Sequence, residues 1–253
     1  MNVALKIIIG IGSFFFTACQ IQKSEKSNEK IIGGLEAESG SFDAVVELGT
    51  CSATRVGPYS YLTAKHCVAS NHWQVGEKVV GHLVYKEGPK HEFAGTIDQI
   101  HEHPSKDIAL MHVMFESPPV GIAVLGKEPA TGPVAATGYG CSKLFVSGGT
   151  TYPGESLGYL QVVFTDLYEA TGGNYDRSRY YYIKGISSTS LGDVQLKGSA
   201  LCPGDSGGGL FSNQGEVYEI VGVNSGVHPY TAVSTFVRTD VFAHYNWIQS
   251  KIR

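Results

Sequence analysis

The sequence lacks any cluster of basic residues, and it carries little charge of either sign. Charged residues make up 17% of the 253 positions, and the formal net charge is -4. Proteins that bind nucleic acids or anionic membrane surfaces usually present a patch of lysine and arginine. The composition therefore predicts no nucleic-acid partner, while a hydrophobic content of 42% is enough for a folded core.

The sequence also lacks an apolar run long enough to span a membrane as a helix. The apolar stretch at residues 7–18 is too short for that purpose and has the length typical of a signal peptide. We therefore expect a signal peptide over residues 1–18. Residues 19–30 are polar and have no apolar periodicity, which predicts a linker or pro-segment.

The end of this leader, FTAC, has small residues directly before Cys19. It resembles the lipobox of bacterial lipoproteins, in which the cysteine becomes the lipidated N-terminus after cleavage. The resemblance implies an exported lipoprotein on the periplasmic or outer face, held to the membrane only through a lipid on Cys19. Ordinary signal cleavage nearby is the alternative and predicts a secreted protein. Export in either form permits disulfides.

Cysteines are few, and their number fits this interpretation. There are five in all: Cys19, Cys51, Cys67, Cys141 and Cys202. If Cys19 carries a lipid, the remaining four are an even number, which is consistent with two disulfides.

The sequence shows no alternation of strands with helices, no internal repeat and no second domain after residue 31. Short apolar or alternating runs are instead separated by Gly, Pro, Asn and Ser, which predicts an all-β barrel or sandwich. The expected strands include residues 42–48, 59–64, 78–85, 108–115, 133–140, 157–164, 219–226 and 231–237.

Only the C-terminal segment has helical periodicity. Its apolar stripe consists of Val241, Tyr245, Ile248 and Ile252. Thr239 or Asp240 is the expected cap at the start of this helix.

Three separated segments contain the residue types of a nucleophilic catalytic site. They are LTAKHCV with His66, SKDIALMHV with Asp107, and CPGDSGGG with Ser206. A serine hydroxyl reacts only when a base removes its proton, so we assign Ser206 as nucleophile, His66 as base and Asp107 as the carboxylate that orients the base. The backbone N–H groups of Gly204 and Ser206 are the expected oxyanion donors.

The stretches TAKHC, DIAL and GDSGG resemble the three signature segments of the trypsin- and chymotrypsin-like serine endopeptidases. The resemblance covers about residues 31–253. It implies two antiparallel six-stranded β-barrels with the catalytic residues in the cleft between them, followed by a C-terminal α-helix. It also implies hydrolysis of peptide bonds in protein or peptide substrates through an acyl-enzyme intermediate, without a cofactor or a metal ion.

The stretch KIIGG at residues 30–34 resembles the activation site of this family's zymogens. The resemblance implies that cleavage after Lys30 frees the ammonium of Ile31. This ammonium then pairs with Asp205, the residue before the nucleophile, and so shapes the oxyanion hole.

The remaining cysteines match the family only in part. Cys51 and Cys67 resemble the bridge that braces the histidine loop. The usual partner of a cysteine at Cys202 lies in a segment that here, at residues 223–232, contains no cysteine. An atypical bridge from Cys141 to Cys202 is therefore expected, and two free buried thiols are the alternative.

The family resemblance also places the substrate pocket. Ala200, six positions before the nucleophile, falls on the pocket floor, where trypsin-like enzymes carry aspartate. Gly226 and Ala232 match wall positions. Without a buried carboxylate the pocket has no strong partner for Lys or Arg, so an apolar or small residue before the scissile bond is expected. Cleavage after Lys30 would then require another protease.

Three alternatives compete with a serine endopeptidase. A non-catalytic binding module on the same fold is the main one, although all three signature segments are intact. A metal-dependent hydrolase has only the HEH triplet at residues 101–103 in its favour, without further ligands at a suitable spacing. An α/β-hydrolase is disfavoured by the order of the three residues and by the absence of a βα unit around Ser206.

Overall fold

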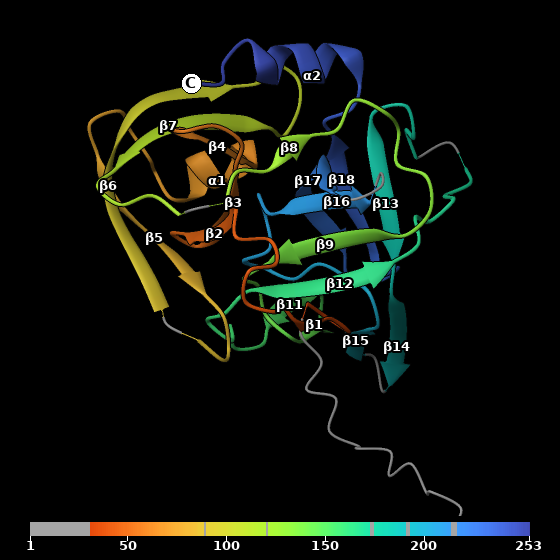
Figure 1. Cartoon of the computed structure of the whole chain (residues 1–253). Helices are drawn as coiled ribbons and strands as arrows, with labels where there is room; N and C mark the ends of the chain where they lie inside the picture. The colour runs from red at the N-terminus through yellow and green to blue at the C-terminus, as the bar shows by residue number, and fades with distance from the viewer. Residues whose placement is uncertain (1–30, 89, 120, 173–174, 191–192, 214–216) are drawn as a thin grey trace, which may run out of the picture.

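The computed structural model describes residues 31–253, apart from residues 89, 120, 173–174, 191–192 and 214–216 (Figure 1). The predicted signal peptide, the linker, Cys19 and Lys30 lie outside the described residues. Strands make up about half of the described chain and helices only a small part, so the predicted all-β architecture is confirmed. No helix in the described ranges is long and apolar enough to cross a membrane.

Six antiparallel strands of the N-terminal half form a closed barrel in the order β2-β3-β4-β7-β6-β5. Large apolar side chains of these strands, such as Tyr61, Leu62 and Leu110, are fully buried. Each buried side chain of this size contributes about 1.5–3 kcal/mol to folding. The strands are β2 (Val45–Leu48), β3 (Cys51–Arg55), β4 (Ser60–Thr63), β5 (Lys78–Val84), β6 (Lys90–Glu102) and β7 (Ala109–Phe115).

The C-terminal half forms a barrel-like sheet of eight strands in the order β1-β12-β9-β16-β17-β18-β13, with β8 paired to β17. It thus has two strands more than the six predicted. The strands are β1 (Leu35–Glu36), β8 (Val124–Leu125), β9 (Val134–Gly138), β12 (Gln161–Thr165), β13 (Tyr180–Lys184), β16 (Gly209–Asn213), β17 (Tyr218–His228) and β18 (Val233–Arg238).

A separate four-stranded sheet, in the order β11-β10-β15-β14, was not expected from the sequence. It lies below the C-terminal half in Figure 1. Two hairpins supply it, and its apolar side chains share a small core with Ile32, Cys202 and Ala200. Its strands are β10 (Leu144–Ser147), β11 (Thr150–Pro153), β14 (Ile186–Ser190) and β15 (Asp193–Lys197).

The C-terminal helix α2 (Phe242–Gln249) lies across the top of the view in Figure 1. It is shorter than the predicted stripe, so Val241 and Ile252 fall outside it. Its buried side chains are His244 and Ile248, so an imidazole and an aliphatic group both pack against the barrels.

The predicted cap of this helix is wrong. Val241 precedes the helix and makes no side-chain capping bond. Thr239 Oγ1 donates instead to a carbonyl of β17, and Asp240 accepts hydrogen bonds from Tyr181 and Arg238. These partners in the C-terminal half satisfy both polar side chains, so neither is available to the helix.

Candidate active site

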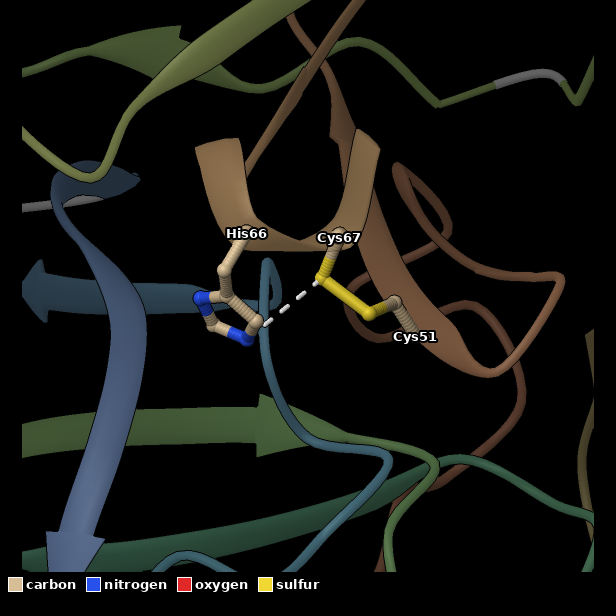
Figure 2. Close-up of side chains that lie close together, drawn as sticks. All are labelled: Cys51, His66 and Cys67. Carbon is tan, nitrogen blue, oxygen red and sulfur yellow. Dashed lines mark hydrogen bonds between the residues drawn. A yellow bond between two sulfur atoms is a disulfide. The ribbon is translucent and has the colours of Figure 1, made fainter. Parts of the chain in front are cut away.

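His66 is held by a short helix that follows the barrel strand β4. This helix, α1 (Lys65–Ser70), has no side-chain cap at its start. A disulfide from Cys67 to Cys51 in β3 anchors it instead, over a separation of 16 residues (Figure 2). The imidazole is therefore carried by a cross-linked turn at the edge of the closed barrel.

Asp107, directly before the buried strand β7, binds His66 at two points. Its Oδ2 lies 2.8 Å from the imidazole Nδ1, and its Oδ1 accepts the His66 backbone N–H at 2.9 Å. Ser225 Oγ donates to the same Oδ2 at 2.7 Å. A proton on Nδ1 faces the carboxylate, so Nε2 is left as the basic nitrogen.

The electrostatics of this pair follow from these hydrogen bonds. The hydrogen bond with Asp107 raises the pKa of His66 above its ordinary value, against the lowering effect of burial. Burial alone would raise the pKa of Asp107, but hydrogen bonds from His66 and Ser225 hold it below its ordinary value. Asp107 is thus ionised at neutral pH and stabilises the imidazolium that forms when His66 accepts a proton.

Ser206 lies in the loop before β16, which is docked on strand β3. Its carbonyl oxygen accepts the Ser52 N–H at 2.8 Å. Gly207 has a φ of +83°, and a Cβ there would overlap Thr63 Oγ1 and the Ser52 carbonyl. Only glycine fits directly after the serine, because the loop approaches the barrel so closely.

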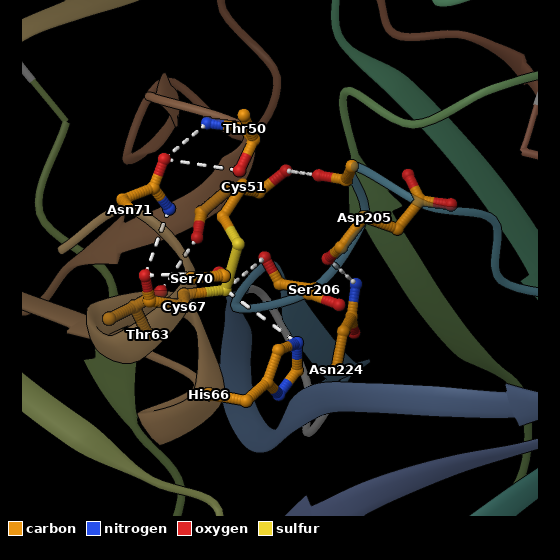
Figure 3. Close-up of a disulfide and its surroundings, with 12 residues drawn as sticks. Thr50, Cys51, Thr63, His66, Cys67, Ser70, Asn71, Asp205, Ser206 and Asn224 are labelled. Carbon is orange, nitrogen blue, oxygen red and sulfur yellow. Dashed lines mark hydrogen bonds between the residues drawn. A yellow bond between two sulfur atoms is a disulfide. The ribbon is translucent and has the colours of Figure 1, made fainter.

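Ser206 and His66 border the same disulfide. Cys67 Sγ lies 3.9 Å from His66 Nε2 and 3.6 Å from the Ser206 carbonyl oxygen (Figure 3). In the part of the chain that the structure describes, no hydrogen bond joins Ser206 Oγ to His66 Nε2. Such a contact is commonly longer in free enzymes than in substrate complexes.

Two backbone N–H groups beside the nucleophile, those of Gly204 and Ser206, donate to no described residue. The carbonyl of Pro203 accepts the Cys141 N–H at 3.1 Å, and that of Asp205 accepts the Gly208 N–H at 3.0 Å. In a planar trans peptide the N–H points away from the carbonyl, so both donors face away from these contacts. Free donors in this position can stabilise a developing oxyanion.

Asp205 is completely buried, with no charged partner among the described residues. Its two oxygens accept the N–H groups of Gly140 and Cys202, both at 2.8 Å. Burial raises the pKa of Asp205 to about 7, against the lowering effect of these two hydrogen bonds. A carboxylate in such a site requires a cation to remain ionised without a large cost.

Ile31 is buried in the core of the C-terminal half. In the uncut chain its backbone N–H donates to Gln161 Oε1 rather than to Asp205. Gln161 Nε2 in turn donates to the Gly140 carbonyl at 2.9 Å. Gly140 also binds Asp205, so Gln161 and Gly140 connect Ile31 to the carboxylate.

The pocket positions named from the sequence lie on the small core of the four-stranded sheet. Ala200 and Ala232 are fully buried there beside the Cys141–Cys202 disulfide, which closes a separation of 61 residues. At Gly226 in β17, a Cβ would meet no atom within 4 Å, so space is open beside it.

Sequence reasoning missed Ser225 and Gln161. The pairing of β17 with β18 shifts register between Asn224 and Gly226, so Ser225 is the extra residue of a bulge. No signal marked Gln161, which reads as an ordinary strand residue.

Among the described residues, Cys51, His66 and Cys67 are the one group of potential metal ligands that lie close together (Figure 2). The two sulfurs are bonded to each other and offer no thiolate, so the chemistry of this set does not suit a metal ion.

The HEH triplet does not converge either. His101 packs against His112 and His103 against His244, at ring-centroid distances of 5.2 and 5.3 Å. These two imidazoles are therefore engaged with different neighbours.

Comparisons with known proteins agree with this geometry. The family model described as Trypsin matches residues 31–248, and the chain belongs to this family. It is 27% identical over 243 residues to venom plasminogen activator Haly-PA of Gloydius brevicauda, covering 92% of this chain and 91% of that protein. It is 26% identical over 257 residues to chymotrypsin-like elastase family member 1 of Canis lupus familiaris, covering 91% and 95%.

A solved structure, human heparin binding protein, shares the fold. The superposition has a TM-score of 0.60 at 17% identity and covers 87% of this chain and 96% of that one. The chain is thus a trypsin-family serine protease by descent and by architecture.

Proposed function

We propose that this protein is an active serine endopeptidase that cleaves protein or peptide substrates. The observation that carries the proposal is the hydrogen-bonded set of His66, Asp107 and Ser225 beside a Ser206 loop with two free backbone N–H donors. These are the parts that acyl transfer requires: a base, an orienting carboxylate, a nucleophile and oxyanion donors.

The chemistry follows from these positions. Ser206 Oγ attacks the scissile carbonyl carbon while His66 Nε2 takes the hydroxyl proton. The oxyanion is stabilised by the N–H groups of Gly204 and Ser206. His66 then gives its proton to the leaving amine, which leaves an ester on Ser206. Water attacks this ester by the same route, and the acid product and the free Ser206 hydroxyl are released.

Activation by cleavage after Lys30 is part of the proposal. The buried Asp205, with a pKa raised to about 7 and no cation, supports it. The Ile31 nitrogen supports it as well, since the ammonium formed by cleavage would supply the missing charge. We propose residues 31–253 as the peptidase domain, residues 19–30 as the linker and residues 1–18 as the signal peptide.

The pocket supports a preference for an apolar or small residue before the scissile bond. Its floor at Ala200 is a small, fully buried apolar residue in place of an aspartate, so that position gives a lysine or arginine side chain no charged partner. On this basis the enzyme does not cut after its own Lys30, and another protease activates it.

We also propose that the protein is exported and lipidated at Cys19. Both disulfides lie within residues 31–253, so neither ties the linker to the domain. Cleavage after Lys30 would then release the domain from the membrane. Recovery of the cut domain in the membrane fraction after a high-salt wash would contradict this release.

The deciding experiment is intact-mass measurement after exposure to a fluorophosphonate. Three forms are compared: the uncut Lys30→Gln variant, the protein cut after Lys30, and the cut Ser206→Ala variant as control. A single adduct in the cut form alone supports both the nucleophile and the activation step. Adducts on cut and uncut forms would retain the peptidase and reject activation by cleavage.

A catalytically inactive binding module on the same fold is the second candidate. The missing hydrogen bond between Ser206 Oγ and His66 Nε2 is the observation in its favour. Absence of any adduct on a folded, cut protein would establish that candidate over the peptidase.

A further inference from the structure

Asn224 in β17 binds the nucleophile loop more extensively than its neighbours do. Its backbone N–H donates to the Gly208 carbonyl at 2.9 Å, and its carbonyl accepts the Gly207 N–H at 2.8 Å. Its side-chain Nδ2 donates to the Asp205 carbonyl at 2.9 Å (Figure 3). The same Nδ2 donates to the Thr137 carbonyl at 2.8 Å. The whole residue is buried, so water does not compete for these bonds.

We propose that Asn224 is a positioning residue that sets the direction of the Ser206 N–H, one of the two oxyanion donors. This inference rests on the proposed peptidase function. The peptide between Asp205 and Ser206 is planar and trans, so the direction of its carbonyl fixes that of its N–H. Asn224 Nδ2 and the Gly208 N–H hold the carbonyl from one side, and the Ser206 N–H therefore points to the opposite side.

The other end of the Asn224 side chain indicates that folding stability is not its main contribution. Asn224 Oδ1 is buried and has no hydrogen-bond partner in the described chain. An unpaired buried acceptor destabilises a fold, so a residue retained only for stability would avoid it. What Asn224 supplies is its pair of donated hydrogen bonds, and one of these ends on the nucleophile loop.

Asn224 and the next residue act on different parts of the machinery. Ser225, the bulged residue, donates to Asp107 and so acts on the base. The Asn224 side chain donates to the Asp205 and Thr137 carbonyls, and in the described chain it makes no hydrogen bond to His66 or Asp107, so it acts on the oxyanion donor. Loss of Asn224 should therefore weaken stabilisation of the transition state without changing the titration of His66.

The test uses Asn224→Ala and Asn224→Ser in the protein cut after Lys30. We expect kcat on a peptide substrate to fall by about 100-fold, the size of a misplaced catalytic group, while KM changes by less than about threefold. Affinity for a peptide trifluoromethyl ketone, which forms an anionic adduct with the serine, should fall in parallel with kcat. The acid limb of the kcat/KM profile should not move.

Thr239→Val is the matched control. Thr239 is also fully buried. Its hydroxyl donates to the Ile220 carbonyl in β17, the strand that carries Asn224, at a point away from the nucleophile loop. It should lose a comparable hydrogen bond and keep wild-type kcat and ketone affinity. Thermal unfolding of all variants distinguishes a variant that fails to fold from a folded variant in which the Ser206 N–H is misdirected.

Several results would overturn the proposal. One is a fall in kcat and ketone affinity no larger than that of Thr239→Val, and another is a shift of the acid limb in either Asn224 variant. If neither Asn224 variant folds, the residue is structural. If the cut wild-type protein takes no fluorophosphonate adduct, the peptidase function fails and this inference fails with it. An adduct on wild type, with unaffected Asn224 variants, rejects this inference alone.

Discussion

Cleavage after Lys30 should reverse the way in which Asp205 affects stability as pH rises. In the uncut chain this buried carboxyl has its pKa raised from 3.8 to about 7. A group whose pKa is higher in the folded than in the unfolded state stabilises the fold at pH values below the unfolded-state pKa. This contribution is lost as the pH rises through the folded-state pKa. The shift corresponds to about 4 kcal/mol of stability lost by the uncut chain between about pH 4 and pH 8.

The cut chain should not show this loss of stability between pH 4 and pH 8. The Ile31 ammonium pairs with Asp205, lowers its pKa again and holds it ionised until the ammonium itself deprotonates near pH 8 or above. The assay is urea unfolding of cut and uncut protein from pH 4.5 to 8, both carrying Ser206→Ala to prevent self-digestion. The difference between the two free energies of unfolding should grow by about 3 kcal/mol over this range.

The difference between the two forms isolates Asp205 from the other titrating groups. His66, with a raised pKa, loses its contribution to stability as pH rises, while His101, His103 and His244, with lowered pKa values, lose theirs as pH falls. These contributions are common to both forms and cancel. A chain that begins at Lys30 displaces the ammonium by one residue and should behave like the uncut form. A pH-independent difference between the cut and uncut forms would refute the pairing.

Three further predictions concern the base, the pocket and the second disulfide. Asp107→Asn removes the main cause of the raised pKa of His66, so the acid limb of the kcat/KM profile should move to lower pH. We also expect kcat to fall by about 10⁴-fold. An acid limb that does not move contradicts the assignment of His66 as the base. Gly226→Val should suppress cleavage after large residues and spare cleavage after alanine in a peptide series, because its side chain enters open space; equal losses on all peptides would place Gly226 outside the pocket. Replacing both Cys141 and Cys202 by serine should lower the free energy of unfolding in urea by about 4 kcal/mol, the value for a loop of this length, and an unchanged stability would argue for free thiols.

The sequence predicted the parts of the fold whose signal lies within a few adjacent residues. Residues 108–115 show the apolar run of a buried strand and form β7, and residues 78–85 correspond to β5. The stretches around His66, Asp107 and Ser206 were also recognisable locally, because TAKHC, DIAL and GDSGG each resemble a short signature segment of the family.

Other elements gave no local signal. Strand β3, Cys51–Arg55, is buried on both faces and therefore shows no alternation of polar and apolar residues. Helix α1 has no cap and depends on a disulfide to a distant strand. The four-stranded sheet depends on the pairing of two hairpins, and its outer strands β11 and β14 are short and largely exposed, so they carry no apolar pattern.

The supporting contacts of the site could not be predicted because they join distant positions. Ser225 binds Asp107 across 118 residues, and the bulge that turns its side chain arises from the pairing of two strands. Gln161 binds Ile31 across 130 residues. Each of these contacts exists only after the two halves of the chain have folded.

The four-stranded sheet has a consequence for how this enzyme could diversify. Ala200 and Ala232 rest on a core built by β10 and β15, whereas His66 and Asp107 belong to the closed barrel. Mutations in the two hairpins can therefore reshape the surroundings of Ala200 and Ala232, the proposed pocket residues, while His66 and Asp107 keep their support. Selection for new substrates could act on one module of the protein, and selection for catalytic rate on another.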